Sequence, residues 1–202
     1  MFHAIDTRLT GLRARYAEPH RDYHGQAHID TMLVGLRALG KAVLHGAAVE
    51  LAIWYHDAIY DPAATDNEAR SAALLRAEMD GLADPTLLDQ AELLIHATAH
   101  HTLPSDVPAA LGPDAALFLD LDMAVLGADR MTFAAYERGI AAEYVPVHGL
   151  LPFRAGRARF LRGMLTRRRL FLTDRFHLTS GAAARRNRAE ALSGLEEESV
   201  PR

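Results

Sequence analysis

The sequence predicts an all-α fold in a single domain over residues 1–202, built from about eight or nine helices. Apolar residues recur at helical spacing, as in Ile29, Met32, Leu33 and Leu36. No stretch of four to eight residues alternates between apolar and polar side chains as a half-buried strand would. Half of the 202 residues are hydrophobic, which is enough for one sizeable core.

Start and stop signals place the first four helices. The first covers residues 4–17 before Pro19, and the second runs from about 25 to 39, where Gly40 ends it. The third, 47–61, is apolar nearly all round, which predicts a helix at the centre of the domain that ends at Pro62. A capping box formed by Thr65 and Glu68 predicts a fourth helix through about residue 79.

The remaining helices follow from similar signals. Asp84 before Pro85 is an N-cap followed by proline at the first helical position, and it predicts a helix through "LLIHATAHH". After a proline-rich loop, "DAALFLDLDMAVLG" predicts a helix that ends at Gly127. Three more ranges are predicted to be helical: 129–144, 152–168 and about 180–196.

Composition limits the classes of partner. With 22 basic and 26 acidic residues and a net charge of −4, the chain has no field that would attract long DNA or RNA. The N-terminal stretch is charged and lacks an apolar run long enough for a signal peptide or a membrane span, so we expect a cytoplasmic protein with no membrane partner. Association of the apolar helices into a homodimer stays open. Because the chain has no cysteine, a metal site must use histidine and carboxylate ligands.

His56 and Asp57 lie side by side in the most apolar segment, "WYHDAIYD". Burying an ionised aspartate without a partner costs several kcal/mol. The closest basic residues in sequence are Lys41 and Arg70, so a divalent cation is an economical counter-charge, since imidazole and carboxylate are both good ligands for transition metals. The alternative is a buried pair that hydrogen-bonds to the backbone and to itself.

Two further pairs of polar residues lie beside or within apolar stretches and are candidate metal ligands. His24 and His28, in "DYHGQAH", are one helical turn apart and share a face if the helix begins early enough. Asp120 and Asp122 occur in the apolar stretch "FLDLDMAVLG" and point about 200° apart around a helix. Only one of these two aspartates can therefore face a given metal ion.

A histidine, a His-Asp pair and a distant aspartate on separate helices resemble the HD superfamily of metal-dependent phosphohydrolases. "YHGQAH" is similar to the YHNxxH stretch of cyclic nucleotide phosphodiesterases. A closer resemblance, to a subgroup of small bacterial predicted phosphohydrolases, covers about residues 16–190 through "PHRDYHGQAHI", "WYHDAIYD", "DNEARSA", "FLDLDMAVLG" and "GRARFLRGMLTRRRLFLTDRF". These motifs identify no substrate.

The resemblance implies a role for each residue. His28, His56, Asp57 and Asp122 would hold one divalent transition metal, namely Mn, Zn, Fe, Co or Ni. A metal-bound water would then hydrolyse a small phosphorylated molecule, either a nucleotide or another phosphate ester or anhydride. His24 would protonate the leaving oxygen, and Asp57 would also orient the water.

The stretch "NEARSA" departs from the pattern of the dinuclear superfamily members, which present a histidine where this chain has Asn67. Asparagine is a poor ligand for a transition metal. We therefore expect one tightly bound metal, with at most a weakly bound second Mg²⁺ or Mn²⁺. Glu68 has two interpretations of equal weight: a base or outer-sphere acceptor at the site, or simply part of the capping box.

Other polar residues are candidates for the pocket. Thr98 and His101 lie on or near the apolar face of their helix and could bind phosphate or a weak second metal, whereas His96 and His100 point roughly the other way. A solvated histidine run is the alternative. In the basic segment after residue 153, Arg157 is the candidate phosphate clamp, since guanidinium groups match phosphate oxygens, although most of these arginines should be solvated.

Two other functional classes remain. One is a non-catalytic HD-type module that senses a nucleotide or a metal, although a degraded site should lose ligands first. The other is an iron oxygenase on a similar scaffold. It requires a dinuclear centre, which Asn67 disfavours.

Overall fold

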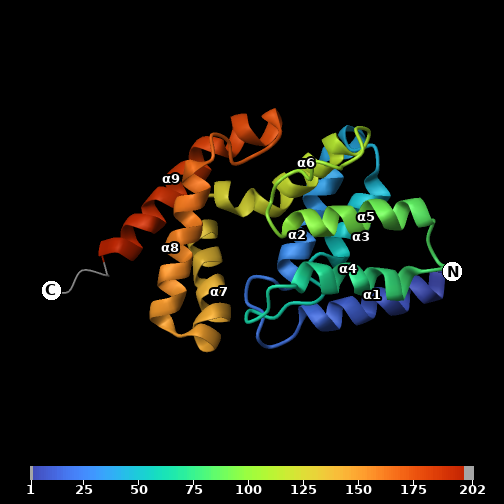
Figure 1. The fold of residues 1–202 in the computed structure, drawn as a ribbon, viewed down its shortest axis with the longest axis horizontal. Helices are drawn as coiled ribbons and strands as arrows, with labels where there is room; N and C mark the ends of the chain where they lie inside the picture. The colour runs from blue at the N-terminus through green and yellow to red at the C-terminus, as the bar shows by residue number, and fades with distance from the viewer. Residues whose placement is uncertain (1, 198–202) are drawn as a thin grey trace. The chain divides into compact units, whose positions relative to one another are not determined.

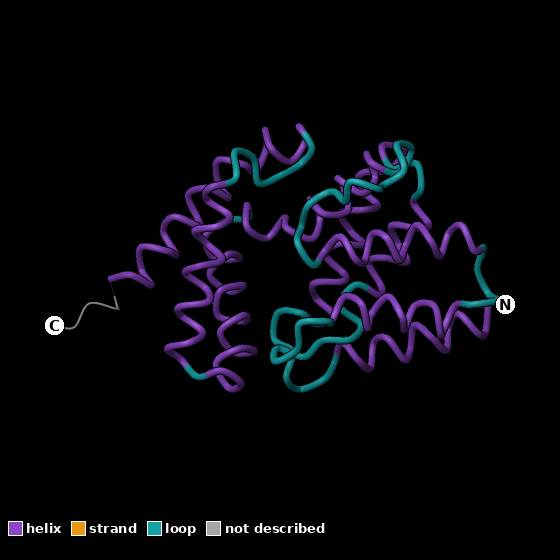
Figure 2. The backbone as a smooth tube through the Cα atoms, in the orientation of Figure 1, coloured by secondary structure: helices purple, strands orange, loops and turns teal. Residues whose placement is uncertain are grey.

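The computed structural model describes residues 2–197, and the chain over this range consists of helices and connecting loops without strands (Figures 1 and 2). The all-α prediction is confirmed. Contacts divide the chain into two compact units, residues 1–121 and 122–202. Each unit is described on its own below.

Six α helices and one short 3-10 helix, Gly40–Ala42, make up the described part of the first unit. The α helices are α1 (Phe2–Tyr16), α2 (Gln26–Leu39), α3 (Gly46–Tyr55), α4 (Asn67–Met79), α5 (Pro85–Thr98) and α6 (Gly112–Asp122, whose last residue begins the second unit). Helix α3 packs against α2, α4 and α5, and most of its side chains are buried, as its apolar sequence predicts. Helix α6 is also enclosed, because every side chain from Asp114 to Leu121 is buried.

Local capping explains where several helices begin and end. The Asp84 carboxylate accepts hydrogen bonds from the amides of Thr86 and Leu87 at the start of α5, with Pro85 in the first turn, as predicted. Gly40 ends α2 with a φ of 54°, a left-handed conformation that glycine adopts without strain.

Two sequence-based predictions in this unit are wrong in detail. Helix α3 ends at Tyr55 and not at residue 61, so His56 and Asp57 occupy the turn that follows it. The predicted capping box is absent, because α4 begins at Asn67, after Thr65, and its N-cap residue Asp66 makes no side-chain capping bond. The Asn67 side chain instead pairs with the backbone amide and carbonyl of Asp61.

A buried carboxylate fixes the start of α3 against α6. Asp114 is 0% exposed and accepts hydrogen bonds from the backbone amides of Leu44 and His45. Its Oδ2 atom also lies 2.8 Å from Nδ1 of His45. These bonds satisfy a buried charge that would otherwise be costly.

The second unit contains a short 3-10 helix, Met123–Gly127, and three α helices, α7 (Arg130–His148), α8 (Leu150–Thr166) and α9 (Asp174–Glu197). Helix α8 packs against both α7 and α9. Asp129 caps α7 by accepting from the amides of Met131 and Thr132, as its sequence position predicts. The buried Asn187 side chain on α9 donates to the carbonyls of Leu126 and Ala128, which joins α9 to the 3-10 helix.

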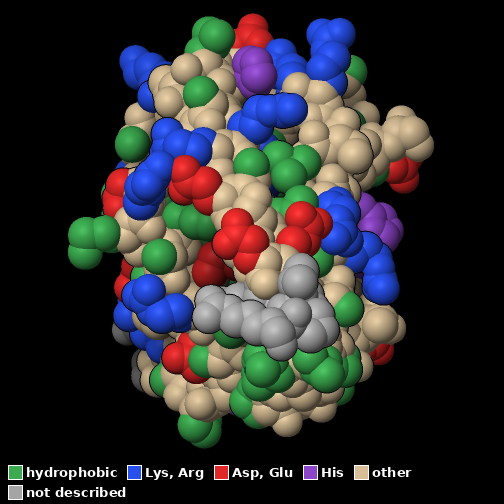
Figure 3. All heavy atoms as spheres, turned by 90° about the vertical axis from the view of Figure 1, so that its left-hand side faces the viewer, with side chains coloured by type: hydrophobic (Ala, Val, Ile, Leu, Met, Phe, Trp, Pro, Cys, Tyr) green, Lys and Arg blue, Asp and Glu red, His purple; other side chains and the backbone are tan. Residues whose placement is uncertain are grey.

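Helix boundaries in this unit also depart from the predictions. The helix predicted over 114–127 becomes α6 followed by the 3-10 helix, and the last helix begins at Asp174 rather than near 180. Basic side chains of α8 and its exit form ion pairs, as in Arg162 with Glu196 and Arg169 with Asp174, both at 2.7 Å. In Figure 3, basic and acidic side chains are interspersed over the face shown.

Among the described helices, none combines the length and the hydropathy that a bilayer-spanning segment needs.

Candidate metal centre

Three helix ends bring together two histidines and an aspartate. His28 lies in the first turn of α2, His56 directly follows α3, and Asp122 is the last residue of α6. One ligand atom from each lies within 4.8 Å of the other two. His28 and His56 are buried and Asp122 is half-buried, so this group could hold a divalent cation.

The two imidazoles face each other through their Nε2 atoms, which are 3.3 Å apart. The other ring nitrogen of His56, Nδ1, lies 3.0 Å from the carbonyl oxygen of Ile53. Because a carbonyl can only accept, this bond is formed with Nδ1 protonated, which leaves Nε2 as the ring nitrogen that can ligate a metal ion. A carbonyl bonded to Nδ1 also fixes the orientation of a histidine that binds metal through Nε2.

Asp57 lies beside the same pair. Its Oδ2 atom is 3.1 Å from Nε2 of His56 and 3.9 Å from Nε2 of His28. Burial acts to raise the pKa of the Asp57 carboxyl, but the neighbouring His56, His24 and His28 outweigh it and hold that pKa well below its usual range. The carboxylate is therefore ionised and faces the histidine nitrogens.

His24 lies in the bend before α2 and not on the helix itself, since α2 begins at Gln26. Its ring nevertheless lies 6.4 Å from that of His28, centroid to centroid. It stacks on Tyr60 at 4.2 Å with an interplanar angle of 28°. Proximity to His28 thus comes from the conformation of this bend and not from a shared helical face.

Arg21 is a site residue that the sequence analysis missed. Its side chain is 0% exposed, and its Nη1 atom donates to the carbonyls of His24, at 3.0 Å, and Asp57, at 2.6 Å. Nη2 donates to the carbonyl of Ala58 at 3.2 Å, and Nε donates to Glu18 at 3.0 Å. One guanidinium group therefore joins the His24 bend to the His56–Asp57 turn.

Two aromatic rings enclose this guanidinium. Its central carbon lies 5.3 Å from the ring centroid of Tyr16 and 5.5 Å from that of Tyr60. Tyr60 thus contacts both Arg21 and His24. The sequence does place a basic residue, Arg21, three positions before His24 in "PHRDYH". It lies too far from Asp57 in the chain to be recognised as a partner of that aspartate.

Gly35 allows α2 to approach α6 closely. A Cβ atom at this position would lie 2.5 Å from Cδ2 of Leu121, a side chain that is only 7% exposed. Leu121 directly precedes Asp122 and Gly35 lies on the same helix as His28, so this contact joins the two segments that carry these ligands. The small residue therefore serves the geometry of the site as well as the packing.

We expect Gly35→Ala to lower the melting temperature, because the added methyl group must displace Leu121, at a cost of about 1–3 kcal/mol. The matched control is Gly11→Ala on α1, where an added Cβ meets nothing within 4 Å. That control should gain up to about 1 kcal/mol from helix propensity alone. Thermal unfolding followed by circular dichroism measures both changes, and an equal shift for the two variants would contradict the contact.

The other residues around the site have separate roles. Asp120 is 1% exposed and does not belong to the group formed by His28, His56 and Asp122. The Asn67 side chain is engaged with the Asp61 backbone.

Three residues predicted near the pocket lie on α4 and α5 or just after them. Glu68 is half-buried in the first turn of α4, and the capping-box explanation for it no longer holds. The buried Thr98 hydroxyl donates to the carbonyl of Ile95 at 2.7 Å. His101 follows α5 in a left-handed conformation with a φ of 47°, while His96 and His100 are exposed.

Arg157 lies on α8 in the second unit and is 8% exposed. It forms a two-bond ion pair with Glu137, with nitrogen–oxygen distances of 2.5 and 3.2 Å. The ring of Tyr136 lies under its guanidinium. The Glu137 carboxylate thus already balances the charge of Arg157. The pKa of Tyr136 is raised, mainly by burial and in part by the charge of Asp122.

Comparisons of the chain with protein-family models, with curated proteins and with solved structures found no match.

Proposed function

We propose that the protein is a metal-dependent hydrolase of a small phosphorylated substrate, either a nucleotide or another phosphate ester or anhydride. The observation that carries this proposal is the convergence of His28, His56 and Asp122, with the Asp57 carboxylate beside both histidines. The pattern of a histidine, a His-Asp pair and a distant aspartate, which resembles the HD superfamily, supplies the reaction class.

The donor set fits a divalent transition metal. Two nitrogens that share a tetrahedral zinc ion at about 2.0–2.1 Å lie about 3.3 Å apart. The two Nε2 atoms of His28 and His56 are 3.3 Å apart. The contact between Nδ1 of His56 and the Ile53 carbonyl leaves Nε2 to ligate, and two carboxylates are close enough to balance the charge. We assign His28, His56, Asp57 and Asp122 as the ligands of one Mn, Zn, Fe, Co or Ni ion.

When bound, such a cation supplies Lewis acidity, which neutralises charge on phosphoryl oxygens and lowers the pKa of water. The protein's own residues bind and orient. His28 and His56 direct ring nitrogens from a buried wall, and the ionised Asp57 carboxylate beside them is positioned to orient the attacking water as a hydrogen-bond acceptor. Burial of this wall limits competing contact with bulk solvent.

His24 is the proposed proton donor to the leaving oxygen. Its ring is close to His28 without belonging to the ligand group, and stacking on Tyr60 restricts its orientation. Arg21 holds the backbone carbonyl of the same residue. An imidazole titrates near neutral pH, which suits proton donation under physiological conditions.

Phosphate release from a library of nucleotides and sugar phosphates, in the presence of each candidate metal, tests the proposal. Turnover should vanish with EDTA and in His56→Ala. It should persist in His96→Ala, which removes an exposed histidine 49% open to solvent. A metal-loaded protein that binds nucleotides without releasing phosphate would refute hydrolysis and indicate a sensing module.

A further inference from the structure

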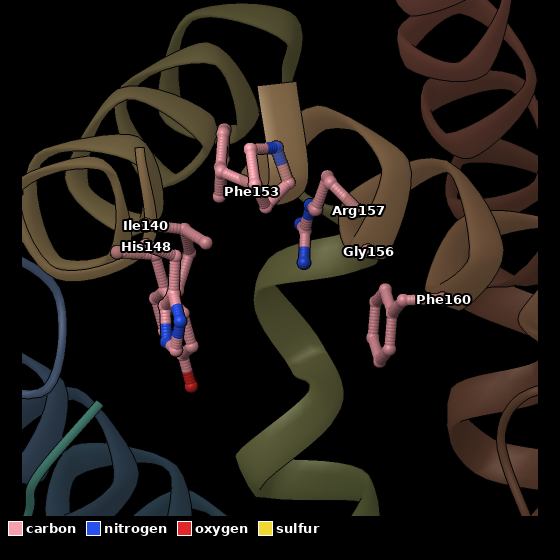
Figure 4. Close-up of a pocket in the computed structure, with 8 residues that line it drawn as sticks. Ile140, His148, Phe153, Gly156, Arg157 and Phe160 are labelled. Atoms are coloured by element: carbon pink, nitrogen blue, oxygen red, sulfur yellow. The ribbon is translucent and has the colours of Figure 1, made fainter. Parts of the chain in front are cut away.

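A cavity lies between α7 and α8 of the second unit. None of the residues that line it is a proposed ligand of the metal centre. The volume of the cavity is about 380 Å³, which falls within the roughly 300–1,000 Å³ typical of ligand pockets. Residues that line it include Ile140, Tyr144 and His148 on α7, and Phe153, Gly156 and Phe160 on α8. Figure 4 shows Arg157 and Phe160 on one side of this space and Ile140 and His148 on the other.

The walls are mainly aromatic. Tyr144 stacks with His148 at 5.8 Å and an angle of 21°, and the ring of Phe153 lies 6.5 Å from that of Tyr144. Phe160 lines the cavity from the next turns of α8. Aromatic faces of this kind favour a flat ring that can stack against them over a flexible aliphatic chain.

The surroundings of Arg157 favour an uncharged ligand. Its guanidinium carbon lies 4.9 Å from the Tyr136 ring centroid and 4.8 Å from that of Phe160, while Glu137 balances its charge. An anion placed here would have to compete with the Glu137 carboxylate. A neutral ring needs no such exchange, and two residues with polar side-chain groups, His148 and Tyr144, also line the cavity.

Gly156 keeps the space open. It lies on the same helical stripe as Phe153 and Phe160, and a Cβ atom there would meet nothing within 4 Å. A larger side chain at this position can therefore enter the cavity without disturbing the packing of α8.

We propose that this cavity binds a neutral, planar, nitrogen-containing ring of the size of a nucleobase. The proposal goes beyond the proposed hydrolysis, since binding of the ring requires neither a metal nor turnover.

Calorimetric titration of the full chain with adenosine, and with ribose as the ring-free probe, tests the proposal. Adenosine should bind to the wild-type protein, and ribose should not. Gly156→Leu fills the cavity and should weaken adenosine binding at least about tenfold. Gly163→Leu is the matched control, because Gly163 lies two turns further along α8 with equally open space around it and does not line the cavity.

Phe160→Leu keeps an apolar wall but removes one stacking face, so it provides a second variant if Gly156→Leu fails to fold. It should also weaken adenosine binding about tenfold. Absence of adenosine binding to the wild-type protein, equal binding by ribose, or an unchanged affinity in both cavity variants would overturn the proposal. So would a dimer, detected by sedimentation velocity, that Gly156→Leu dissociates and adenosine leaves intact.

Discussion

Replacing His28 with alanine is expected to remove the bound metal, whereas replacing His24 with alanine is expected to leave it in place. His28 contributes one of two nitrogens that face each other 3.3 Å apart. Its loss should weaken metal affinity by more than the roughly 10- to 100-fold that loss of an outer-sphere partner causes. Titration with Mn²⁺ and metal analysis of the purified variants measure this difference.

The His24 variant should lose rate instead. A positioned proton donor contributes about 10²- to 10⁴-fold to catalysis, so phosphate release should fall by that factor at unchanged metal content. Circular dichroism controls for folding in both variants, because His28 is only 7% exposed. Loss of metal in the His24 variant, with retention in the His28 variant, would reverse the two assignments.

The second large effect is expected at Arg21, whose substitution should destabilise the protein. Arg21→Ala removes donors from the carbonyls of His24, Asp57 and Ala58 and leaves the buried space unfilled. Each hydrogen bond to a charged group is worth about 1.5–3 kcal/mol, and breaking a buried charged network costs about 3–5 kcal/mol. For a chain of this size, we expect the melting temperature to fall by about 6–20 °C.

Arg21→Lys should recover only part of this loss, because a single ammonium group cannot span acceptors on both segments as the guanidinium fork does. The matched control is Arg130→Ala, which removes an exposed ion pair with Glu190 and should cost less than about 1 kcal/mol. Thermal unfolding of the three variants under one metal concentration makes the comparison. A melting temperature for Arg21→Ala equal to that of the control variant would show that the network is not stabilising.

Helix caps formed by neighbouring residues could be predicted from the sequence. Asp84 and Asp129 each accept bonds from amides two and three residues ahead, so the whole interaction is contained in a few letters. The helical periodicity likewise gave the fold class, since it reports which face of each segment is buried.

The end of α3 could not be predicted in the same way. Ala58 and Tyr60 are 1% and 8% exposed although they lie beyond the helix, so the apolar run continues past Tyr55 in buried loop. Periodicity alone does not separate a buried loop from a buried helix. The Asn67 side chain likewise forms hydrogen bonds with the backbone of Asp61. These bonds stabilise a loop before α4 that is longer than a capping box at Thr65 predicts.

The candidate site likewise contains residues that could be predicted from the sequence and residues that could not. Three of the four ligands expected from the motifs, His28, His56 and Asp122, lie together in a group that could hold a metal ion, and Asp57 lies beside His56. Arg21 was missed because it is 36 residues from Asp57 in the chain and reaches the turn only through the folded arrangement. The pairing of Arg157 with Glu137, 20 residues earlier, was hidden for the same reason, and it removes the free charge that a phosphate clamp would need.

Because His28, His56 and Asp122 come from the ends of three different helices, a bound cation would act as a reversible crosslink that exists only in the native state. Stabilisation by such a ligand grows with the logarithm of its free concentration and reaches about 2.7 kcal/mol at one hundred times the dissociation constant. The resistance of the chain to proteolysis should then depend on the supply of metal around it.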